Sequence, residues 1–436
     1  MCDKKSPCSE CSDKIDAYRT VCDELKTHCP RLVPSPLWGI SLANIASMAP
    51  EAAEAICDGC GGIAETIHRY WQGFNRVDRC SACNTFGLVH IDEDWRYCIY
   101  SGCSQSSTSM HGEPSSPEDI GVAYLDGVKP LCESCHLAKH LGYAFIIGKY
   151  SDALGKLAEV NKISLDRAKE LANNTFEIHK RLSEVKRWVI RIGDLPGIDG
   201  ERKAGIETLL NEMYRKGFYI KSGWLHYSSW DEQPDYRANE ETAEVLLEAS
   251  RLAGSSSLGG LKENLLTVIK NAMEHRNILV LDSELRLFID LIFKKWPKLF
   301  NLLTSNIKKE DLMVRVANIN LLGKWMIFTK PSMCPQAFRT IVDMLEERGL
   351  AYSGKILSNR DAYIRRDEIP IIIYVPSALA PSMVSDVAKV VDAMRRMLGI
   401  SKLPKFKPDL FTSEELYYGT SSYKPYIYIY RSNTTL

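Results

Sequence analysis

Cysteine is almost absent from the last two thirds of this sequence, and long hydrophobic runs are absent throughout. Of the 14 cysteines, all but Cys334 lie at or before Cys135. No stretch approaches the roughly 18 apolar residues of a membrane-spanning helix, and Met1 to Ser12 lacks the apolar core of a secretion signal. We therefore expect a cytoplasmic protein without a membrane partner.

Net charge is also lacking, since 55 Lys and Arg residues balance 55 Asp and Glu residues. A polycation that coats nucleic acid is therefore excluded, and any nucleic-acid binding must come from a local patch. The composition is 45% hydrophobic and 25% charged, which is ordinary for a globular protein. A chain of 436 residues predicts two to three domains.

The cysteines that are present fall in pairs with the spacing of metal ligands. Disulfides are rare in the cytoplasm, so clustered pairs favour metal binding. Two CxxC pairs lie about fifty residues apart and are candidate metal ligands: Cys80, Cys83, Cys132 and Cys135. The second pair is followed by His136 and His140, which a helix would place on one face.

A second zinc site is possible near the N-terminus. Its candidate ligands are two further CxxC pairs: Cys8, Cys11, Cys57 and Cys60. Cys22 and Cys29 compete with them as ligands, and the alternative is a set of unpaired surface thiols. The sequence therefore predicts either one zinc ion or two.

The order of elements around the first zinc site is that of a ββα-metal finger. Apolar spacing predicts a helix over 63–74, and aromatic and β-branched residues predict a β-hairpin over 86–100. The segment 101–117 is rich in Ser, Gly and Pro and predicts a flexible insertion. The second CxxC pair and its helix follow.

These residues resemble the HNH nuclease superfamily, closest to a bacterial subgroup with a double zinc knuckle, over about residues 30–200. The motifs that carry the resemblance are Cys80-x-x-Cys83, His90-x-Asp92-Glu93-x-Trp95-x-Tyr97 and Cys132-x-x-Cys135-His136-x-x-Lys139-His140-x-Gly142. The resemblance implies that the four cysteines hold a structural zinc. It also implies a separate catalytic Mg or Mn ion between the hairpin and the helix, with a general base on the hairpin.

Carried over to this chain, the implied catalytic residues are His90, Asp92, Glu93, His136 and His140. The chain has Asp92-Glu93 where the subgroup has His-Glu, and His90 where the subgroup has an acid. The asparagine expected before the second knuckle is missing. Residues two apart on a strand share a face, so His90 and Asp92 can exchange roles; the alternative is an inactive relative that keeps the fold.

Other interpretations stay open for this region. His136 and His140 can instead buttress the zinc site, whereas a zincin is disfavoured because Leu137 stands where its glutamate base is needed. Two helices are predicted over 151–192, and the second carries a basic run that fits either phosphate contacts or a solvated face: Lys169, His179, Lys180, Arg181, Lys186, Arg187 and Arg191.

The rest of the chain predicts helices and then alternating strands and helices. Apolar spacing predicts helices over 238–253, 258–275, 282–296, 335–348 and 383–398. Strands are predicted over 313–318, 324–329, 352–357, 369–375 and 426–430.

Residues 296–436 resemble the Bles family. The resemblance rests on Gly323-Lys324-Trp325, Ser353-Gly354-Lys355, Leu398-Gly399-Ile400 and Phe406-Lys407-Pro-Asp409 with Thr412 and Tyr418. It implies the fold of the cap-binding translation initiation factor and a phosphothreonine-lyase-like label. We expect an anionic ligand, phosphorylated or a nucleotide, at four residues: Lys324, Trp325, Lys355 and Lys407. Lyase chemistry of this type needs a histidine acid, and no histidine follows His275.

The sequence therefore predicts an α+β multidomain protein. Its segments are a Cys-rich region (1–62), an HNH-like zinc and nuclease domain (63–197), a helical connector (198–297) and a curved antiparallel sheet backed by helices (298–436). The leading hypothesis is a metal-dependent nuclease acting on nucleic acid, DNA more than RNA. The alternatives are a non-catalytic zinc-finger binding module, and a lyase or nucleotide-binding activity in the last domain.

Overall fold

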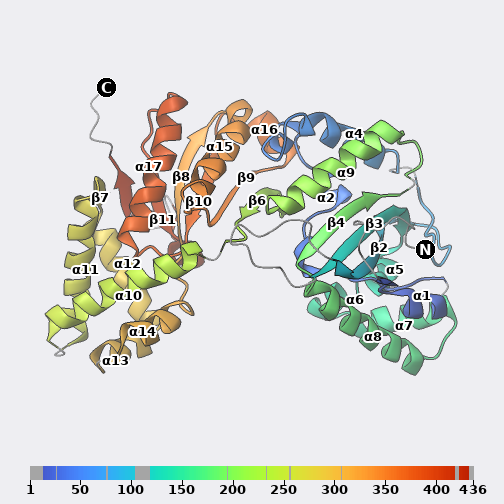
Figure 1. The fold of residues 1–436 in the computed structure, drawn as a ribbon, viewed down its shortest axis with the longest axis horizontal. Coiled ribbons are helices and arrows are strands. Elements are labelled where there is room, and N and C mark those ends of the chain that lie inside the picture. The colour runs from blue at the N-terminus through green and yellow to red at the C-terminus, as the bar shows by residue number, and fades with distance from the viewer. Residues whose placement is uncertain are drawn as a thin grey trace. The chain divides into compact units, whose positions relative to one another are not determined.

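The computed structural model describes residues 13–25, 27–74, 77–103, 118–193, 195–231, 233–254, 257–305, 307–417 and 422–431. The described chain is a mixed α+β protein that divides into two compact units, Met1–Lys221 and Ser222–Leu436 (Figure 1). Each unit has its own sheet and its own helices, and each is described by itself below.

The first unit contains the predicted zinc site. Its strands are β1 (Asp13–Asp16), β2 (His90–Cys103), β3 (Glu118–Leu131), β4 (Arg187–Ile192) and β5 (Phe218–Lys221). Its helices are α1 (Arg19–Glu24), η1 (Ser35–Leu37), α2 (Leu42–Ala46), α3 (Pro50–Ala53), α4 (Cys60–Gln72), α5 (Glu133–Lys139), α6 (Leu141–Ile146), α7 (Tyr150–Asn161), α8 (Leu165–Ser183) and α9 (Gly200–Arg215).

A four-stranded sheet of order β1-β2-β3-β4 organises the first unit. β1, β2 and β3 are antiparallel, and β4 runs parallel to β3. Helices α5 to α8 lie together below this sheet in Figure 1, and apolar residues from α1, α5, α6, α7 and α8 form one buried cluster. This cluster fixes α5, the helix that carries His136.

The hairpin differs from the prediction. Residues 86–100 do not fold back on themselves; β2 is one long strand, and its partner β3 begins only at Glu118. The register pairs Asp92 with Lys129 and His90 with Leu131. The predicted insertion 101–117 is wrong at its start, because residues 101–103 belong to β2, and its residues 104–117 lie outside the described part of the chain. The chain passes from β3 directly into the second CxxC pair.

The second helix predicted within 151–192 is shorter than expected. α8 begins after the N-cap Ser164, whose side chain accepts a hydrogen bond from the Arg167 amide, and it ends at Ser183. Arg187 and Arg191 therefore lie on strand β4 and not on the basic helix. Their alternation with buried Trp188 and Ile190 follows the two-residue period of a strand.

The second unit is built on an antiparallel sheet. Its strands are β6 (Trp224–Ser228), β7 (Ile278–Val280), β8 (Gly323–Thr329), β9 (Ser353–Leu357), β10 (Ile369–Val375), β11 (Lys405–Pro408) and β12 (Tyr428–Tyr430). They follow the order β6-β9-β10-β8-β11-β12-β7, and every pairing among them is antiparallel. An antiparallel sheet in this unit agrees with the prediction.

Helices surround this sheet. They are α10 (Gln233–Ala253), α11 (Leu258–Glu274), α12 (Asp282–Lys295), α13 (Lys298–Thr304), α14 (Lys309–Val316), η2 (Pro331–Met333), α15 (Cys334–Glu346), α16 (Arg360–Arg365), α17 (Pro381–Met397) and α18 (Asp409–Ser413). α15 and α17 pack against the central strands (Figure 1). The predicted strand 313–318 is wrong, because these residues mostly belong to α14; Leu312 and Val316, four apart, are its buried side.

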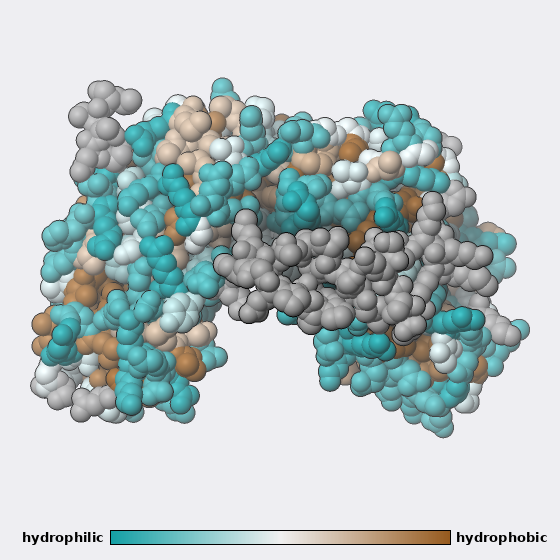
Figure 2. All heavy atoms as spheres, in the orientation of Figure 1, coloured by the Kyte–Doolittle hydropathy of each residue, from teal (hydrophilic) through white to brown (hydrophobic). Residues whose placement is uncertain are grey.

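The predicted helical connector 198–297 is not one element of the structure. α9 packs against α4 and β4 in the first unit, whereas α10, α11, β7 and α12 belong to the second unit. Among the described residues, no helix is both long and apolar enough to cross a membrane. The face drawn in Figure 2 is mostly hydrophilic, with hydrophobic side chains in small patches.

Candidate functional site

The first CxxC pair lies in a tight turn that is tied to strand β3. The Cys80 amide donates to the Thr85 carbonyl (3.0 Å), and the Asn84 amide donates to the Cys80 carbonyl (2.9 Å). Asn84 takes the left-handed conformation with φ 64°, which asparagine tolerates better than most residues. The Ser81 amide donates to the Pro130 carbonyl (2.8 Å), which places this turn beside the end of β3.

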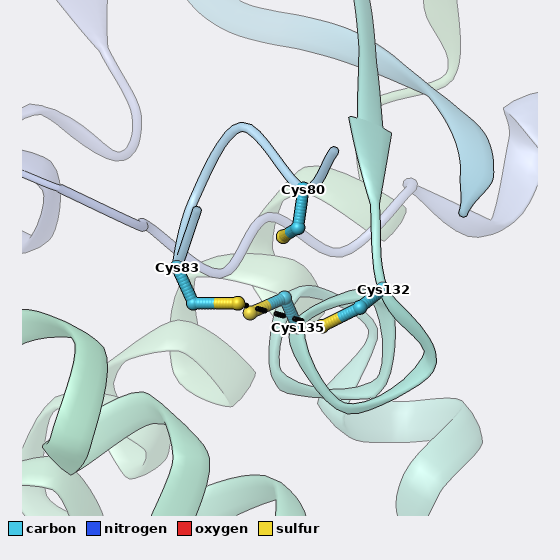
Figure 3. A group of neighbouring side chains, drawn as sticks. All are labelled: Cys80, Cys83, Cys132 and Cys135. Atoms are coloured by element: carbon cyan, nitrogen blue, oxygen red, sulfur yellow. Dashed lines mark hydrogen bonds between the residues drawn. The ribbon is translucent and has the colours of Figure 1, made fainter. Parts of the chain in front are cut away.

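The second pair lies where β3 passes into α5. Cys132 is the N-cap of α5 and Cys135 lies in the first helical turn. Both sulfur atoms point toward the turn that carries Cys80 and Cys83. Figure 3 shows the four cysteine side chains converging from these two segments. Their sulfur atoms all lie within 4.8 Å of one another, which fits the predicted structural zinc site: Cys80, Cys83, Cys132 and Cys135.

The electrostatics of this group also fit a cation. All four cysteines are free thiols, and Cys80 and Cys135 are buried. Burial and then the neighbouring sulfur atoms raise the pKa of Cys135 far above its usual range. The pKa of Cys83 is about 6, because hydrogen bonds from Thr85 outweigh the effect of burial. Four sulfur donors are typical of Zn or Fe–S sites, and a bound cation would stabilise the thiolates.

A second group of potential ligands lies between β2 and α5. Asp92 Oδ1 lies 2.8 Å from His140 Nε2 and 3.7 Å from His136 Nε2. One donor atom from each residue lies within 4.8 Å of the other two. His136 belongs to α5 and His140 is its C-cap residue, four positions later, so both rings face β2 as predicted. His90 joins them at the rim, because its exposed ring stacks on His136 with 5.2 Å between centroids.

Lys139 balances the charge of this second group. Its Nζ lies 2.5 Å from Asp92 Oδ2 and donates to the Glu93 carbonyl, and the side chain is almost fully buried. Burial would raise the pKa of Asp92, but hydrogen bonding by His140 and the Lys139 ammonium hold it well below its usual range. Burial and then His140 lower the pKa of His136 to about 4, so its ring is neutral at pH 7 and able to ligate an ion.

Glu93 is not part of this group, although the sequence placed it there. Its carboxylate accepts hydrogen bonds from the Ala43 amide (2.9 Å) at the start of α2 and from the Trp95 indole (2.7 Å). Neighbouring residues on a strand point to opposite faces, so Glu93 cannot share the side of Asp92. Burial raises the pKa of Glu93 to about 7. The Glu93 side chain therefore connects β2 to the start of α2 by a hydrogen bond.

The predicted second zinc site is corrected by the structure. Cys57 and Cys60 are joined to each other in a disulfide and so offer no thiolate to an ion. Cys8 and Cys11 lie outside the described residues. Cys22 and Cys29 form another disulfide. Disulfides are typical of oxidising compartments, so these two do not fit the cytoplasmic location that we predicted from the lack of a secretion signal and of a membrane-spanning run. That location stays a prediction.

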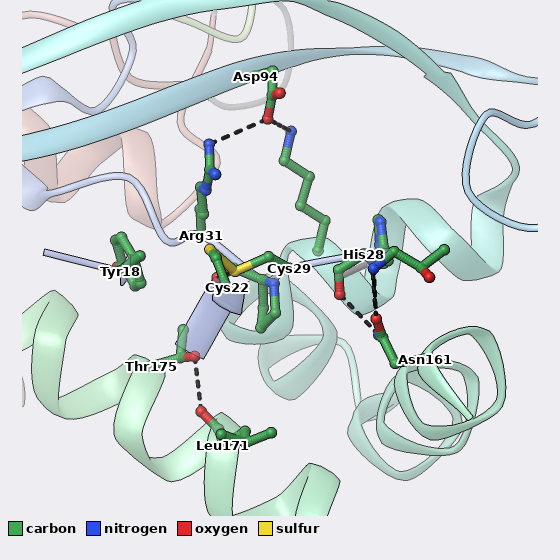
Figure 4. Close-up of a disulfide and its surroundings, with 12 residues drawn as sticks. Tyr18, Cys22, His28, Cys29, Arg31, Asp94, Asn161, Leu171 and Thr175 are labelled. Carbon is green, nitrogen blue, oxygen red and sulfur yellow. Dashed lines mark hydrogen bonds and ion pairs between the residues drawn. A yellow bond between two sulfur atoms is a disulfide. The ribbon is translucent and has the colours of Figure 1, made fainter. Parts of the chain in front are cut away.

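The Cys22–Cys29 disulfide closes a loop that contacts the four-cysteine group. Figure 4 shows His28 beside this disulfide and hydrogen-bonded to Asn161 at the end of α7. The His28 ring bonds the Cys135 carbonyl at 2.8 Å, and Arg31 pairs with Asp94. Sequence reasoning missed this support, because a histidine 107 residues from its partner carries no spacing signal. The sequence pattern also gives no sign of the pairing of Lys139 with Asp92.

The two candidate metal sites differ in the ions that their donors suit. For the second group, two imidazoles and one carboxylate favour transition ions, whereas Mg prefers oxygen ligands. Mn therefore fits Asp92, His136 and His140 better than Mg does.

In the second unit, three of the four predicted ligand residues share one face of the sheet. Lys324 pairs in register with Lys407 and with Tyr374, and Lys355 pairs with Ile372. Trp325 points to the opposite face, where it is fully buried and donates to the Val384 carbonyl (2.9 Å). Its prediction as a ligand residue is therefore wrong, because it is one position from Lys324 on the strand.

A histidine that the sequence analysis did not consider lies beside these lysines. His226 on β6 pairs in register with Lys355. The C-terminal domain was predicted to begin near residue 298, and β6 lies before that boundary. No histidine follows His275, but the folded unit begins at Ser222 and therefore contains His226.

Comparison with known proteins adds no relative. A scan of protein-family models gives no match, and neither curated proteins nor solved structures match the chain. The functional argument therefore rests on the geometry of the sites.

Proposed function

We propose that the first unit is a metal-dependent nuclease of the HNH type that hydrolyses phosphodiester bonds of nucleic acid, DNA more than RNA. The observation that carries the proposal is the group Asp92, His136 and His140, whose donor atoms lie within 4.8 Å of one another. A second observation supports it: the strand–strand–helix order of β2, β3 and α5, joined at its base by the four-cysteine site.

Each residue then has a defined part in the reaction. Asp92, His136 and His140 would hold a divalent ion, which would supply positive charge to the scissile phosphate. His90 is exposed at the rim beside His136 and accepts a proton from the attacking water. The water oxygen bonds to phosphorus as the bond from phosphorus to the leaving sugar oxygen breaks. The four cysteines keep β3 and α5 in place and take no part in the chemistry.

The test is cleavage of plasmid, single-stranded DNA and RNA with Mn, with Mg or with EDTA. We expect cleavage with Mn, none with EDTA, and a loss of at least about 100-fold in rate for Asp92→Asn and for His90→Ala. Glu133→Gln is the matched control, because Glu133 is exposed on α5 and pairs with Lys149. Intact substrate under every condition contradicts the proposal. Cleavage at the wild-type rate by Asp92→Asn and His90→Ala contradicts it as well.

One observation favours a second candidate, a non-catalytic zinc module that binds nucleic acid or protein. Asp92 is already neutralised by Lys139 and His140, so the carboxylate needs no ion in order to be buried. This candidate predicts intact nucleic acid together with gel retardation that weakens as salt is raised. The same cleavage experiment separates the two, because retardation without cleavage supports only the second.

A further inference from the structure

One face of the sheet in the second unit carries four lysines on three strands: Lys324, Lys355, Lys405 and Lys407. Lys324, Lys355 and Lys407 are the three that lie near Asp409. Lys324 on β8 lies directly opposite Lys407 on β11. On the other side, Lys324 pairs with Tyr374 of β10. Lys355 of β9 pairs with Ile372, two residues before Tyr374, so it shares the same face. The opposite face holds Trp325 and other buried apolar residues. The lysines lie together because side chains alternate between the two faces along each strand.

These lysines are poorly compensated. Lys324 Nζ lies 2.5 Å from Asp409 Oδ1 and 3.2 Å from Thr412 Oγ1. Lys407 Nζ donates to the Leu416 carbonyl at 2.9 Å. Within the described part of the chain, Lys355 pairs with no carboxylate, and its Nζ lies over the Trp224 ring, 4.7 Å from the centroid. Three ammonium groups thus face one carboxylate.

This arrangement is costly for the protein without a ligand. Lys324 and Lys407 are each less than a tenth exposed. Like charges directly opposite each other on neighbouring strands destabilise a sheet. Burial, followed by repulsion from Lys324, lowers the pKa of Lys407 to about 8 and also lowers that of Lys355. Apolar residues of similar length at these positions would be more stabilising, so the lysines point to a role in binding.

We propose that Lys324, Lys355 and Lys407, together with the Thr412 hydroxyl, bind a dianionic phosphate group of a small molecule. Three ammonium groups and one carboxylate leave an excess of two positive charges, which matches a phosphate dianion. The set contains no arginine, but lysine is also a common phosphate ligand in proteins. Lysines act as point charges that can surround a tetrahedral group. This proposal concerns the second unit and stands independently of the nuclease proposal.

Aromatic rings beside the lysines indicate which chemical group could accompany the phosphate. Lys355 lies over Trp224, and Lys407 lies 4.1 Å from the centroid of the Tyr417 ring, whose side chain is 47% exposed. An aromatic group next to the phosphate, as in a nucleoside monophosphate, could contact these rings. Free phosphate, pyrophosphate and a nucleotide share the phosphate chemistry, and the experiment distinguishes them.

The test uses the full chain and isothermal titration with inorganic phosphate, pyrophosphate, adenosine monophosphate and adenosine, at constant ionic strength. We expect binding of at least one phosphate compound, no binding of adenosine, and a loss of at least tenfold in affinity in Lys355→Met and in Lys407→Met. Tighter binding of the monophosphate than of free phosphate identifies a nucleotide as the ligand class. Lys330→Met is the matched control, since Lys330 is exposed at the end of β8.

Thermal unfolding shows whether these variants fold. Without ligand, both methionine variants should melt at the wild-type temperature or a few degrees above it, because each removes an uncompensated cation. Phosphate should raise the melting temperature of the wild type and of His140→Ala, which separates this site from the one in the first unit. The proposal is overturned if no phosphate compound binds. It is also overturned if the folded methionine variants bind phosphate compounds with the wild-type affinity.

Discussion

At the scale of single residues, Asp92 is the centre of the first site. Its Oδ1 contacts His140, which can ligate a metal ion. Its Oδ2 contacts Lys139, whose ammonium group supplies the positive charge that a metal ion would otherwise supply. Whether the site needs a metal therefore depends on Lys139.

Lys139→Met should destabilise the metal-free protein by about 3 kcal/mol, because it leaves a buried carboxylate unpaired. A divalent ion held by Asp92 would take over the role of the ammonium. We therefore expect Mn to restore most of the lost stability to this variant and to stabilise the wild type less, measured by denaturant unfolding with and without Mn. If Mn stabilises both equally or neither, Asp92 does not bind the ion.

Lys407 in the second unit gives a prediction about pH. Its pKa is about 8 in the folded protein, against 10.5 for an ordinary lysine. Between these values the unfolded chain binds more protons, so stability should rise with pH from about 8 to about 10.5. The groups that face Lys407 are Lys324, Asp409 and Tyr417.

The measurement is the melting temperature of the wild type and of Lys407→Met at pH 7.5, 9 and 10 without ligand. The advantage of the variant should be largest at pH 7.5 and shrink as the pH is raised, because deprotonation relieves the wild type of its buried charge. A difference that stays constant over this range contradicts the assignment.

At the scale of elements, two short turns depend on the four-cysteine site. Cys135→Ser should remove the zinc and loosen both turns, since their apolar support is a small cluster with Leu131 and Val160. Elemental analysis should find one zinc per wild-type chain and less than about 0.2 in the variant, because the site needs all four ligands. Cys334→Ala, a buried free cysteine of the second unit, is the control and should keep its zinc.

The contact between β3 and β4 depends on a glycine. A Cβ added at Gly121 would lie 2.6 Å from the ring of Trp188, its partner in register. We expect Gly121→Ala to destabilise the protein by about 1–3 kcal/mol through overpacking. Gly155→Ala on the exposed side of α7, where the added Cβ meets nothing within 4 Å, should instead stabilise by about 0.5–1 kcal/mol. Denaturant unfolding measures both, and a neutral Gly121→Ala would contradict the packing argument.

At the scale of the whole molecule, each unit has its own sheet, buried core and candidate site. The two candidate sites should therefore respond to different ligands. In hydrogen-exchange mass spectrometry of the full chain, a zinc chelator should raise exchange in residues 77–103 and 118–145. Phosphate should instead lower exchange in β8, β9 and β11. Exchange changes that spread equally over both units with either reagent would contradict this separation.

The sequence predicted those parts of the site that depend on local chemistry. CxxC spacing identified the four cysteines, and the helical spacing of His136 and His140 placed both rings on the side of β2. The two-residue period put His90 and Asp92 on one face, where both contact His136. The strand over 369–375 was identified with its observed bounds, since a continuous apolar run of seven residues marks a buried strand.

Only the tertiary structure decided the rest, because the deciding contacts join residues distant in sequence or depend on register. Register directed the Glu93 carboxylate toward α2 and the Trp325 ring into the core, although each residue adjoins a residue of a site. Packing made 309–316 a helix, since its short apolar pattern fits either period. The pairing of Lys139 with Asp92 and of His226 with Lys355 needed the strands to be in place. Local spacing thus determined which residues can ligate, whereas strand register and burial decided which of them meet.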